Sequence, residues 1–299
     1  MIAQSMKRVE SQTAPEFNER IRRQTQASIE HYSKHPELIA QRLKELDSEW
    51  DVERMLQFNS AALSLIGLAL AKRNLKWLML PMAVQGFFLQ HGLQGWCPPL
   101  PVFRRAGIRT AREIEIERHA LKSLRGDYRK TPQDAPSELL QAAASNGVSA
   151  DGTLATLVAP TLNRVPRNTE AALNQQIQIE TERRVKSVVH SPEAQEGRLN
   201  ELEQEWDIER TIEVEAPLMS LAGLALGAAL GRKWLVLPVL AQSMMLLHAV
   251  QGFYPMLPLF RRLKSRTEDE IAQERYAIKA LRGDFDTVHS EDDPQQPVA

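Results

Sequence analysis

The chain has 299 residues, with 37 basic and 38 acidic side chains and a net charge of −1. This balance excludes the basic surface that nucleic-acid-binding proteins use. A single cysteine excludes an internal disulfide framework and an all-thiolate zinc site. The mean hydropathy of −0.35 is that of a soluble protein, but the average conceals long uncharged segments.

The sequence contains two copies of one unit. Glu49–Arg54, Glu-Trp-Asp-Val-Glu-Arg, recurs 156 residues later as Glu-Trp-Asp-Ile-Glu-Arg, and Leu124–Tyr128 recurs 157 residues later. Self-similarity at this length predicts two tandem units rather than a solenoid. We expect the units at 13–130 and 169–287, a linker at 131–168 and a disordered tail at 288–299.

The first helices of each unit are expected to be amphipathic. Ile39, Leu43, Leu46 and Trp50 recur at helical spacing, and the second unit repeats the last three positions. Such a stripe predicts a face that packs on other helices. The segment 16–33 is expected to lie on an anionic membrane surface or to be an ordinary solvated helix.

Two apolar segments follow in each unit. Trp77–Trp96 is 20 residues long, which makes about 30 Å of helix and matches the hydrocarbon core of a bilayer. Trp234 begins a segment of the same kind, and shorter apolar runs, 60–71 and 216–230, precede the two. The sequence thus predicts a membrane hairpin at about 57–97 and another at about 214–254, with a fresh helix start at Pro217. The two shorter runs are expected to span as well, or else to dip into the membrane and pack behind their neighbours. A buried hairpin of a soluble protein is the alternative to both.

The tryptophans and the basic residues suggest how the hairpins lie. All five tryptophans flank the apolar runs, which is typical of an interfacial aromatic belt. Eight basic residues follow the hairpins and five lie in the two turns. By the positive-inside rule, the termini and linker are expected in the cytoplasm, in agreement with the absence of a predicted cleaved signal peptide.

After each hairpin, the sequence predicts an amphipathic helix with a clear start and end. Thr110 and Glu113 form a capping box, repeated by Thr267 and Glu270. Gly126 and Gly283 end the same helices. In the linker, Ser137–Ser145 is expected to form a short helix that ends at Asn146-Gly147.

One element resembles a known family. Gly95–Phe103, Gly-Trp-Cys-Pro-Pro-Leu-Pro-Val-Phe, followed by Gly107-Ile-Arg-Thr, is similar to the YgaP-like transmembrane domain family. The resemblance covers about 56–110 and, more weakly, 213–267, where Tyr254 replaces Cys97. It implies a membrane hairpin in a bacterial inner membrane. The rhodanese domain of the namesake has no counterpart here, so its sulfur-transfer chemistry is not expected.

Polar residues within the apolar segments are the candidate site. His91 and His248 are the sharpest candidates, because ionisable groups within membrane helices are costly. They could bind haem, form a proton path or, more simply, hydrogen-bond between helices. The glutamines expected to share that last role are Gln85, Gln94, Gln242 and Gln251.

Other residues carry weaker hypotheses. Cys97 is a possible reactive thiol, although free cysteines most often pack. Small residues at Gly67, Gly223, Gly227 and Gly231 predict close helix packing, inside a hairpin or in a homodimer. The Glu-Trp-Asp-x-Glu-Arg segments are expected to be solvated helix faces with ion pairs.

The sequence as a whole predicts an all-α, multi-pass inner-membrane protein with about four membrane helices plus amphipathic cytoplasmic helices. It contains no Gly-rich phosphate loop, catalytic triad signature or zinc-protease motif, so we expect no enzyme activity and no cofactor. A scaffold or helix–helix interaction role is the leading hypothesis, with the bilayer, a second copy or a helical protein as partner and no nucleic acid. A haem, redox or proton-conducting protein and a soluble helical adaptor are the alternatives.

Overall fold

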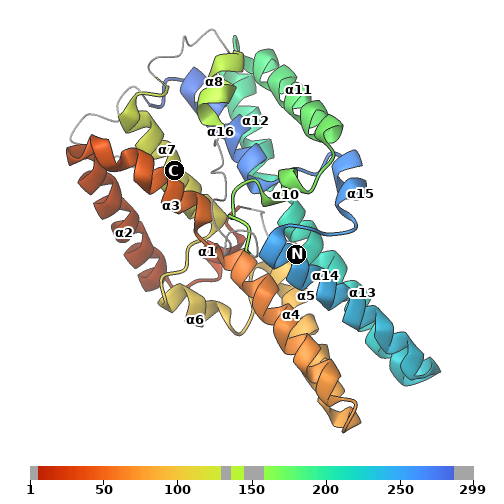
Figure 1. Cartoon of the computed structure of the whole chain (residues 1–299). Coiled ribbons are helices and arrows are strands. Elements are labelled where there is room, and N and C mark those ends of the chain that lie inside the picture. Colours follow the sequence, from red (N-terminus) through yellow and green to blue (C-terminus); the bar gives the residue numbers. More distant parts are fainter. Residues whose placement is uncertain (1–5, 129–135, 145–157, 286–299) are drawn as a thin grey trace.

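The computed structural model describes residues 6–128, 136–144 and 158–285. Every regular element in these ranges is a helix, which confirms the all-α prediction. The molecule has two parts, a body of amphipathic helices and a bundle that projects from it (Figure 1). The predicted tail at 288–299 and the predicted Asn146-Gly147 helix end lie outside the described residues.

Two helical hairpins form the bundle. The first consists of α4 (Val52–Leu70), the short 3-10 helix η2 (Leu75–Leu78) and α5 (Met79–Gln94). The second consists of α13 (Ile208–Leu230), the 3-10 helix η3 (Arg232–Leu235) and α14 (Val236–Gln251). Each helix packs on its hairpin partner and also on one helix of the other hairpin: α4 packs on α14, and α5 on α13. The far ends of both hairpins point away from the body (Figure 1).

The predicted helix start at Pro217 is wrong, because α13 runs without interruption from Ile208 through this proline. Pro217 has no N–H to donate to the carbonyl of Glu213, one turn earlier. Gly92 of α5 packs against that free carbonyl, and a Cβ atom built on Gly92 would lie 2.9 Å from it. Close packing by the neighbouring hairpin thus accompanies the proline inside the helix.

The predicted small-residue positions let the two helices of a hairpin approach each other. A Cβ atom on Gly67 would lie 2.6 Å from Pro81 Cδ, and one on Gly223 would lie 2.4 Å from Pro238 Cδ. A Cβ on Gly227 would meet Leu235 at 2.6 Å. Gly231 has a φ of 112° and forms the turn instead. Of the two predicted roles, these contacts favour packing inside the hairpin.

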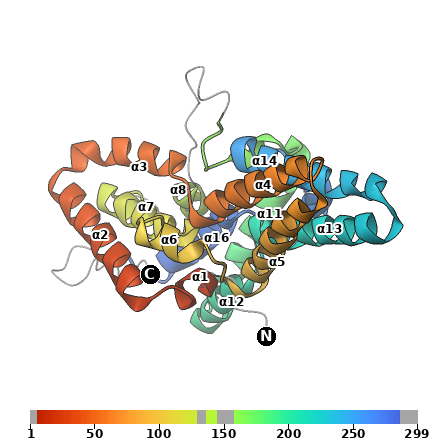
Figure 2. The ribbon, with the colours of Figure 1, turned by 90° about the horizontal axis from the view of Figure 1, so that it is seen from below.

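The body contains seven helices of eight residues or more among the described residues. They are α2 (Pro15–Lys34), α3 (Ile39–Ser48), α7 (Ala111–Arg125), α8 (Pro136–Ala143), α11 (Ala171–Val188), α12 (Pro192–Gln204) and α16 (Glu268–Leu281). Shorter helices connect them: α1 (Arg8–Ser11), η1 (Pro36–Leu38), α6 (Leu100–Arg105), α10 (Arg164–Arg167) and α15 (Leu257–Arg262). Figure 2 shows the same molecule from below, with α2 and α3 on the far side of the body from the tip of α13.

The predicted packing faces and helix caps are present. Ile39, Leu43 and Leu46 pack with Ile114 and Leu121 in one core cluster. Both capping boxes form, with the Thr110 and Thr267 side chains accepting hydrogen bonds from the backbone. The linker helix is α8, within one turn of its predicted bounds. Trp50 lies beyond the end of α3, and its ring packs against Arg54 and not on this cluster.

The segment 16–33 lies in α2, which is an ordinary solvated helix packed on the body. Ile21, Thr25 and Ile29 face the interior. Arg22 and Arg23 are exposed and pair with Glu19, at 2.9 and 2.7 Å. The apolar face of α2 is therefore already covered by protein.

Several residues contact their own sequence match. Gln85 and Gln242 hydrogen-bond each other at 3.0 Å in the bundle. In the body, His119 stacks on Tyr276 with ring centroids 3.6 Å apart, and Tyr128 stacks on Phe285 at 4.3 Å. Each pair is separated by 157 positions. The matched segments therefore meet each other in both parts of the molecule.

Matched contacts also begin earlier than the predicted units. The Met6 N–H bonds the carbonyl of Glu203 at 3.4 Å, and the Leu162 N–H bonds that of Asp47 at 3.0 Å. Met6 and Leu162 lie seven residues before the predicted starts at 13 and 169. The last part of the predicted linker thus makes the same backbone contact as the segment that precedes residue 13.

Candidate functional site

Two fully buried arginines join the hairpins at the base of the bundle. Arg54 of α4 donates from Nε to the carbonyl of Ala249 at 2.7 Å and from Nη2 to that of Val250 at 3.2 Å, at the end of α14. Arg210 of α13 does the same for α5, donating to Gly92 at 3.0 Å and Leu93 at 3.4 Å. The last carbonyls of a helix lack partners within it and carry partial negative charge, so each guanidinium stabilises a helix end of the other hairpin.

The residues around these arginines hold them in place. Each guanidinium lies over a tryptophan ring, Arg54 over Trp50 and Arg210 over Trp206, both at 4.1 Å from the ring centroid. Asp51 accepts a hydrogen bond from the backbone of Arg54 at 2.7 Å and so caps α4, as Asp207 caps α13. The expectation of a solvated helix face is therefore wrong, because partners on the other hairpin bury the arginine of each segment.

Beside each arginine lies a buried group of four polar side chains. We call one the Arg8 cluster (Arg8, Glu53, His91 and Glu213) and the other the Arg164 cluster (Arg164, Glu209, His248 and Gln57). The members correspond one to one in the sequence match, in the order given. Each cluster draws residues from both hairpins and from a segment that enters the body.

The Arg164 cluster is centred on one carboxylate with three partners. Arg164 pairs with Glu209 at 2.8 Å, and His248 Nε2 lies 2.9 Å from Glu209 Oε2. Gln57 donates from Nε2 to the same oxygen at 2.7 Å. One cation and one anion therefore balance when the imidazole is neutral.

The Arg8 cluster has fewer contacts within hydrogen-bond distance, although Gln57 Oε1, Arg164 Nη1 and His248 Nδ1 of the Arg164 cluster also lack a partner among the described residues. Arg8 Nη2 lies 2.8 Å from Glu213 Oε2 and 3.8 Å from Glu53 Oε1. His91 Nε2 lies 4.0 Å from Glu213 Oε2, beyond hydrogen-bond distance. No described residue bonds either ring nitrogen of His91, Glu53 Oε2 or Glu213 Oε1. Buried polar atoms are seldom left without a partner, so each such atom needs an explanation.

A single sequence difference separates the two clusters. The position held by Gln57 in the Arg164 cluster is held by Glu213 in the Arg8 cluster. The Arg8 cluster thus has two carboxyl groups against one guanidinium. Both side chains are fully buried.

Of the predicted polar residues, the histidines and two of the glutamines are buried between helices. His91 and His248 each face a carboxylate of α13. Gln85 donates to Ser64 at 2.8 Å as well as to Gln242, and Gln242 donates to Ser220 at 2.6 Å. The other two, Gln94 and Gln251, are exposed at the ends of α5 and α14.

Glycines bring the two arginine segments against the hairpins. Gly95 and Gly252 follow α5 and α14 with φ angles of 84° and 77°. A Cβ atom on Gly95 would lie 2.4 Å from the carbonyl oxygen of Arg8, and one on Gly252 would lie 2.4 Å from that of Arg164. Any other residue there would be strained and would also displace an arginine of a cluster.

Cys97 is buried and lines an apolar groove of about 440 Å³ between α4 and α5, with Leu56, Asn59 and Phe88 among its walls. In the second half, Tyr254 replaces Cys97 and its hydroxyl donates to Glu215, the match of Asn59. The two halves therefore differ here as well, through a larger side chain in the second.

The charged members of the clusters other than histidine were not predicted as site residues. Polar residues at helical spacing are typical of a solvated surface, so their burial had no local signal. The one signal available was the unchanged recurrence of Glu-Trp-Asp-x-Glu-Arg in both units. Among the described residues, no group of three or more His, Cys, Asp or Glu side chains is arranged to hold a metal ion.

Comparisons of the chain with protein-family models, with curated proteins and with solved structures gave no match. The resemblance to the YgaP-like family therefore rests on the Gly95–Phe103 element and its neighbours alone.

Proposed function

We propose that the protein is a multi-pass inner-membrane scaffold. In this proposal the two hairpins cross the bilayer as four helices and hold the body on its cytoplasmic face. The observation that supports it best is the apolar surface of the hairpin arms, which the protein itself leaves uncovered.

The arms expose large apolar side chains along their length. Exposed examples on each arm are Phe58, Ile66, Met79 and Phe87 in the first hairpin, and Leu218, Leu230, Val236 and Leu240 in the second. α13 and the continuous η3–α14 segment are long and apolar enough to cross a membrane, and only 39% and 33% of their apolar windows are buried. A core helix of a soluble protein would be mostly buried, which favours the membrane over the soluble adaptor.

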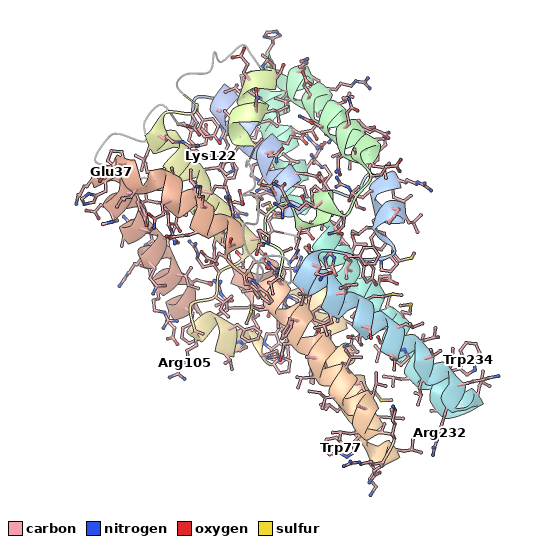
Figure 3. All side chains as sticks on the ribbon, viewed as in Figure 1. Glu37, Trp77, Arg105, Lys122, Arg232 and Trp234 are labelled. Atoms are coloured by element: carbon pink, nitrogen blue, oxygen red, sulfur yellow. The ribbon has the colours of Figure 1, made fainter. Side chains whose placement is uncertain are left out.

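Both ends of the bundle suit a membrane interface. Trp77, Arg232 and Trp234 lie at the far tips of the arms (Figure 3). Near the base, α6 and α15 expose Val102 and Leu259 beside the exposed Arg105 and Arg262. Exposed apolar and basic side chains on one short helix are suited to the headgroup region.

The matched contacts support a duplicated architecture. A residue can touch its own match only near a twofold axis, and such contacts occur in the bundle at Gln85 and in the body at His119 and Tyr128. We infer a pseudo-twofold axis along the bundle, so that both units have the same orientation in the membrane. This arrangement differs from the inverted repeats of many transporters.

The scaffold role follows from the connection between bundle and body. Arg8 and Arg164 are contributed by segments that enter the body, and both are fixed by carboxylates of the bundle helices. These ion pairs connect the body to the bundle, so that the body could present its helices to a second copy or to a helical partner.

Membrane partition tests this proposal. We expect the wild-type protein to stay in the membrane pellet after an alkaline carbonate wash. Replacing Ile66 and Leu240, both exposed on the arms, by glutamate is expected to reduce the pellet fraction, because each charge costs about 3 kcal/mol in the bilayer centre. The matched control is Ile179→Glu, at an exposed isoleucine of the body. Release of the wild-type protein into the supernatant would refute the proposal.

A further inference from the structure

We propose that the Arg8 cluster is a proton-binding site in which Glu213 holds an exchangeable proton and donates it toward His91, while the Arg164 cluster binds none. The inference concerns the interior of the bundle and does not depend on whether the arms enter a bilayer. It rests on charge, burial and the atoms that lack partners.

The charge of the Arg8 cluster is the first argument. Arg8 contributes one positive charge, whereas ionised Glu53 and Glu213 contribute two negative charges, so the cluster carries −1 when His91 is neutral. Ionised groups without compensation are costly in a protein interior. One bound proton brings the cluster to neutrality. In the Arg164 cluster, Gln57 removes the second carboxylate, and no proton is needed.

The surrounding charges do not remove this imbalance. Asp51, Asp207, Glu209, Arg210 and Glu268 all act on members of the cluster through space. Asp207 and Arg210 belong to the same helix start and offset each other, as do Asp51 and Arg54. Glu209 is paired with Arg164, and Glu268 is paired with Arg275.

The buried atoms without hydrogen-bond partners indicate that the proton resides on Glu213. Glu213 Oε1 and both ring nitrogens of His91 lack hydrogen-bond partners within the described residues, and both side chains are fully buried. A proton on the Glu213 carboxyl group would supply the missing donor, and His91 Nε2, 4.0 Å from Glu213 Oε2, could accept from it once the two side chains approach. A proton on His91 instead would leave both carboxylates of the cluster ionised and would add a second buried cation.

The proton can exchange because the cluster reaches solvent at one point. The side chain of Glu53 is 13% exposed, whereas those of Glu213 and His91 are 0% exposed. Glu53 is therefore the member of the cluster closest to solvent, and it shares the Arg8 guanidinium with Glu213. A buried glutamate and histidine reached through a second carboxylate are groups of the kind found in proton relays of membrane proteins.

The two clusters provide reciprocal variants for a test. Glu213→Gln gives the Arg8 cluster the composition of its twin, and Gln57→Glu gives the Arg164 cluster the composition of the Arg8 cluster. Each new residue already occupies the matched position, so both variants are expected to fold, which circular dichroism checks. The readout is the infrared C=O absorption of protonated carboxyl groups in the purified full-length protein at neutral pH.

We expect the wild-type spectrum to contain one band that Glu213→Gln removes, and Gln57→Glu to add a second band of the same kind. Glu53→Gln should also remove the band, because a single remaining carboxylate is balanced by Arg8. Glu209→Gln, in the twin cluster, should leave it unchanged. A Glu213→Gln spectrum identical to that of the wild type, or no added band in Gln57→Glu, would overturn the proposal. None of these outcomes depends on the carbonate wash, so the two proposals can fail separately.

Discussion

The guanidinium groups of Arg54 and Arg210 are held by geometry that a lysine cannot reproduce. Each donates to two successive carbonyls from different nitrogens and lies over an indole ring. The planar fork of arginine matches such a pair of acceptors, whereas an ammonium is a compact point charge. These two side chains therefore supply hydrogen bonds from each hairpin to the unpaired carbonyl groups at a helix end of the other.

Arg54→Lys and Arg210→Lys are each expected to lower the free energy of unfolding by about 1–3 kcal/mol, because at least one buried carbonyl loses its donor. Thermal unfolding in detergent, followed by circular dichroism, measures this effect. Arg105→Lys, at an exposed arginine of α6, is the control and should leave the midpoint unchanged. Equal unfolding temperatures for Arg54→Lys and the control would show that the paired hydrogen bonds of the guanidinium do not contribute to stability.

His119 makes the stability of the body depend on pH. It is fully buried, bonds the Tyr128 hydroxyl through Nδ1 and lies 3.3 Å from Glu115. Burial lowers the pKa of His119 to about 3, although Glu115 opposes this shift. The unfolded chain binds the proton near pH 6.5 and the folded chain does not, so stability falls as the pH drops from 6.5 toward 3.

Between pH 7 and pH 5, this one group is expected to cost about 2 kcal/mol of stability. His119→Gln should therefore show a smaller loss than the wild type over the same interval, whatever its stability at pH 7. Denaturant unfolding at the two pH values gives the comparison, with His35→Gln at an exposed position as the control. Parallel losses in the wild type and His119→Gln would contradict this account.

At the scale of helices, one glycine in each hairpin lets its two helices approach closely, because a side chain there would collide with the partner helix. Gly67 and Gly223 occupy matched positions and face prolines in the first turns of α5 and α14. Proline removes a donor near the start of a helix, where none is needed, and its ring can then lie against the neighbouring backbone. The pair of glycine and proline thus sets the spacing within each hairpin.

Gly223→Ala is expected to destabilise the protein by about 1–3 kcal/mol through overpacking against Pro238. Gly86→Ala is the matched control, since it lies on α5 with nothing within 4 Å of the new Cβ atom. Thermal unfolding and the oligomeric state in detergent are measured together. If Gly223→Ala changes the oligomeric state but not the stability, this glycine serves a contact between copies instead.

The local patterns of the sequence predicted the elements of the body well, and its buried charges poorly. Thr110 with Glu113, and Gly126 after them, define a helix by interactions within a few residues, so the sequence pattern is sufficient. Arg54 finds its partners 195 and 196 positions away, and no local pattern distinguishes it from a solvated arginine. Pro217 likewise lies inside α13 because a different hairpin packs against the gap it leaves.

At the scale of the whole molecule, the proposed orientation places the arm tips outside the cell and the body inside. Half of the eight basic residues that follow the hairpins are buried in the body, among them Arg104, which pairs with Glu113 at 2.6 Å, and Arg261, which pairs with Glu270 at the same distance. The charge bias acts during insertion, before these pairs form, so their later burial is compatible with the orientation.

Cysteines placed at Arg73 and Arg232, in the two turns, are expected to react with a membrane-impermeant maleimide in intact cells. A cysteine at Arg105 should react only after lysis. The native Cys97 is buried and provides little background. Labelling at position 105 in intact cells, without labelling at 73 and 232, would reverse the orientation.

The arginine of each hairpin bonds a helix end of the other hairpin, and this reciprocity suggests how such a chain could arise. A shorter chain with one hairpin would lack the carbonyl partners of its buried arginine and the Gln85–Gln242 bond, and two identical copies would supply both by isologous pairing. Joining the copies in one chain makes assembly independent of concentration and lets the two sides diverge. The extra carboxyl group of Glu213 opposite Gln57 is such a divergence, one that a symmetric pair of identical chains could never contain.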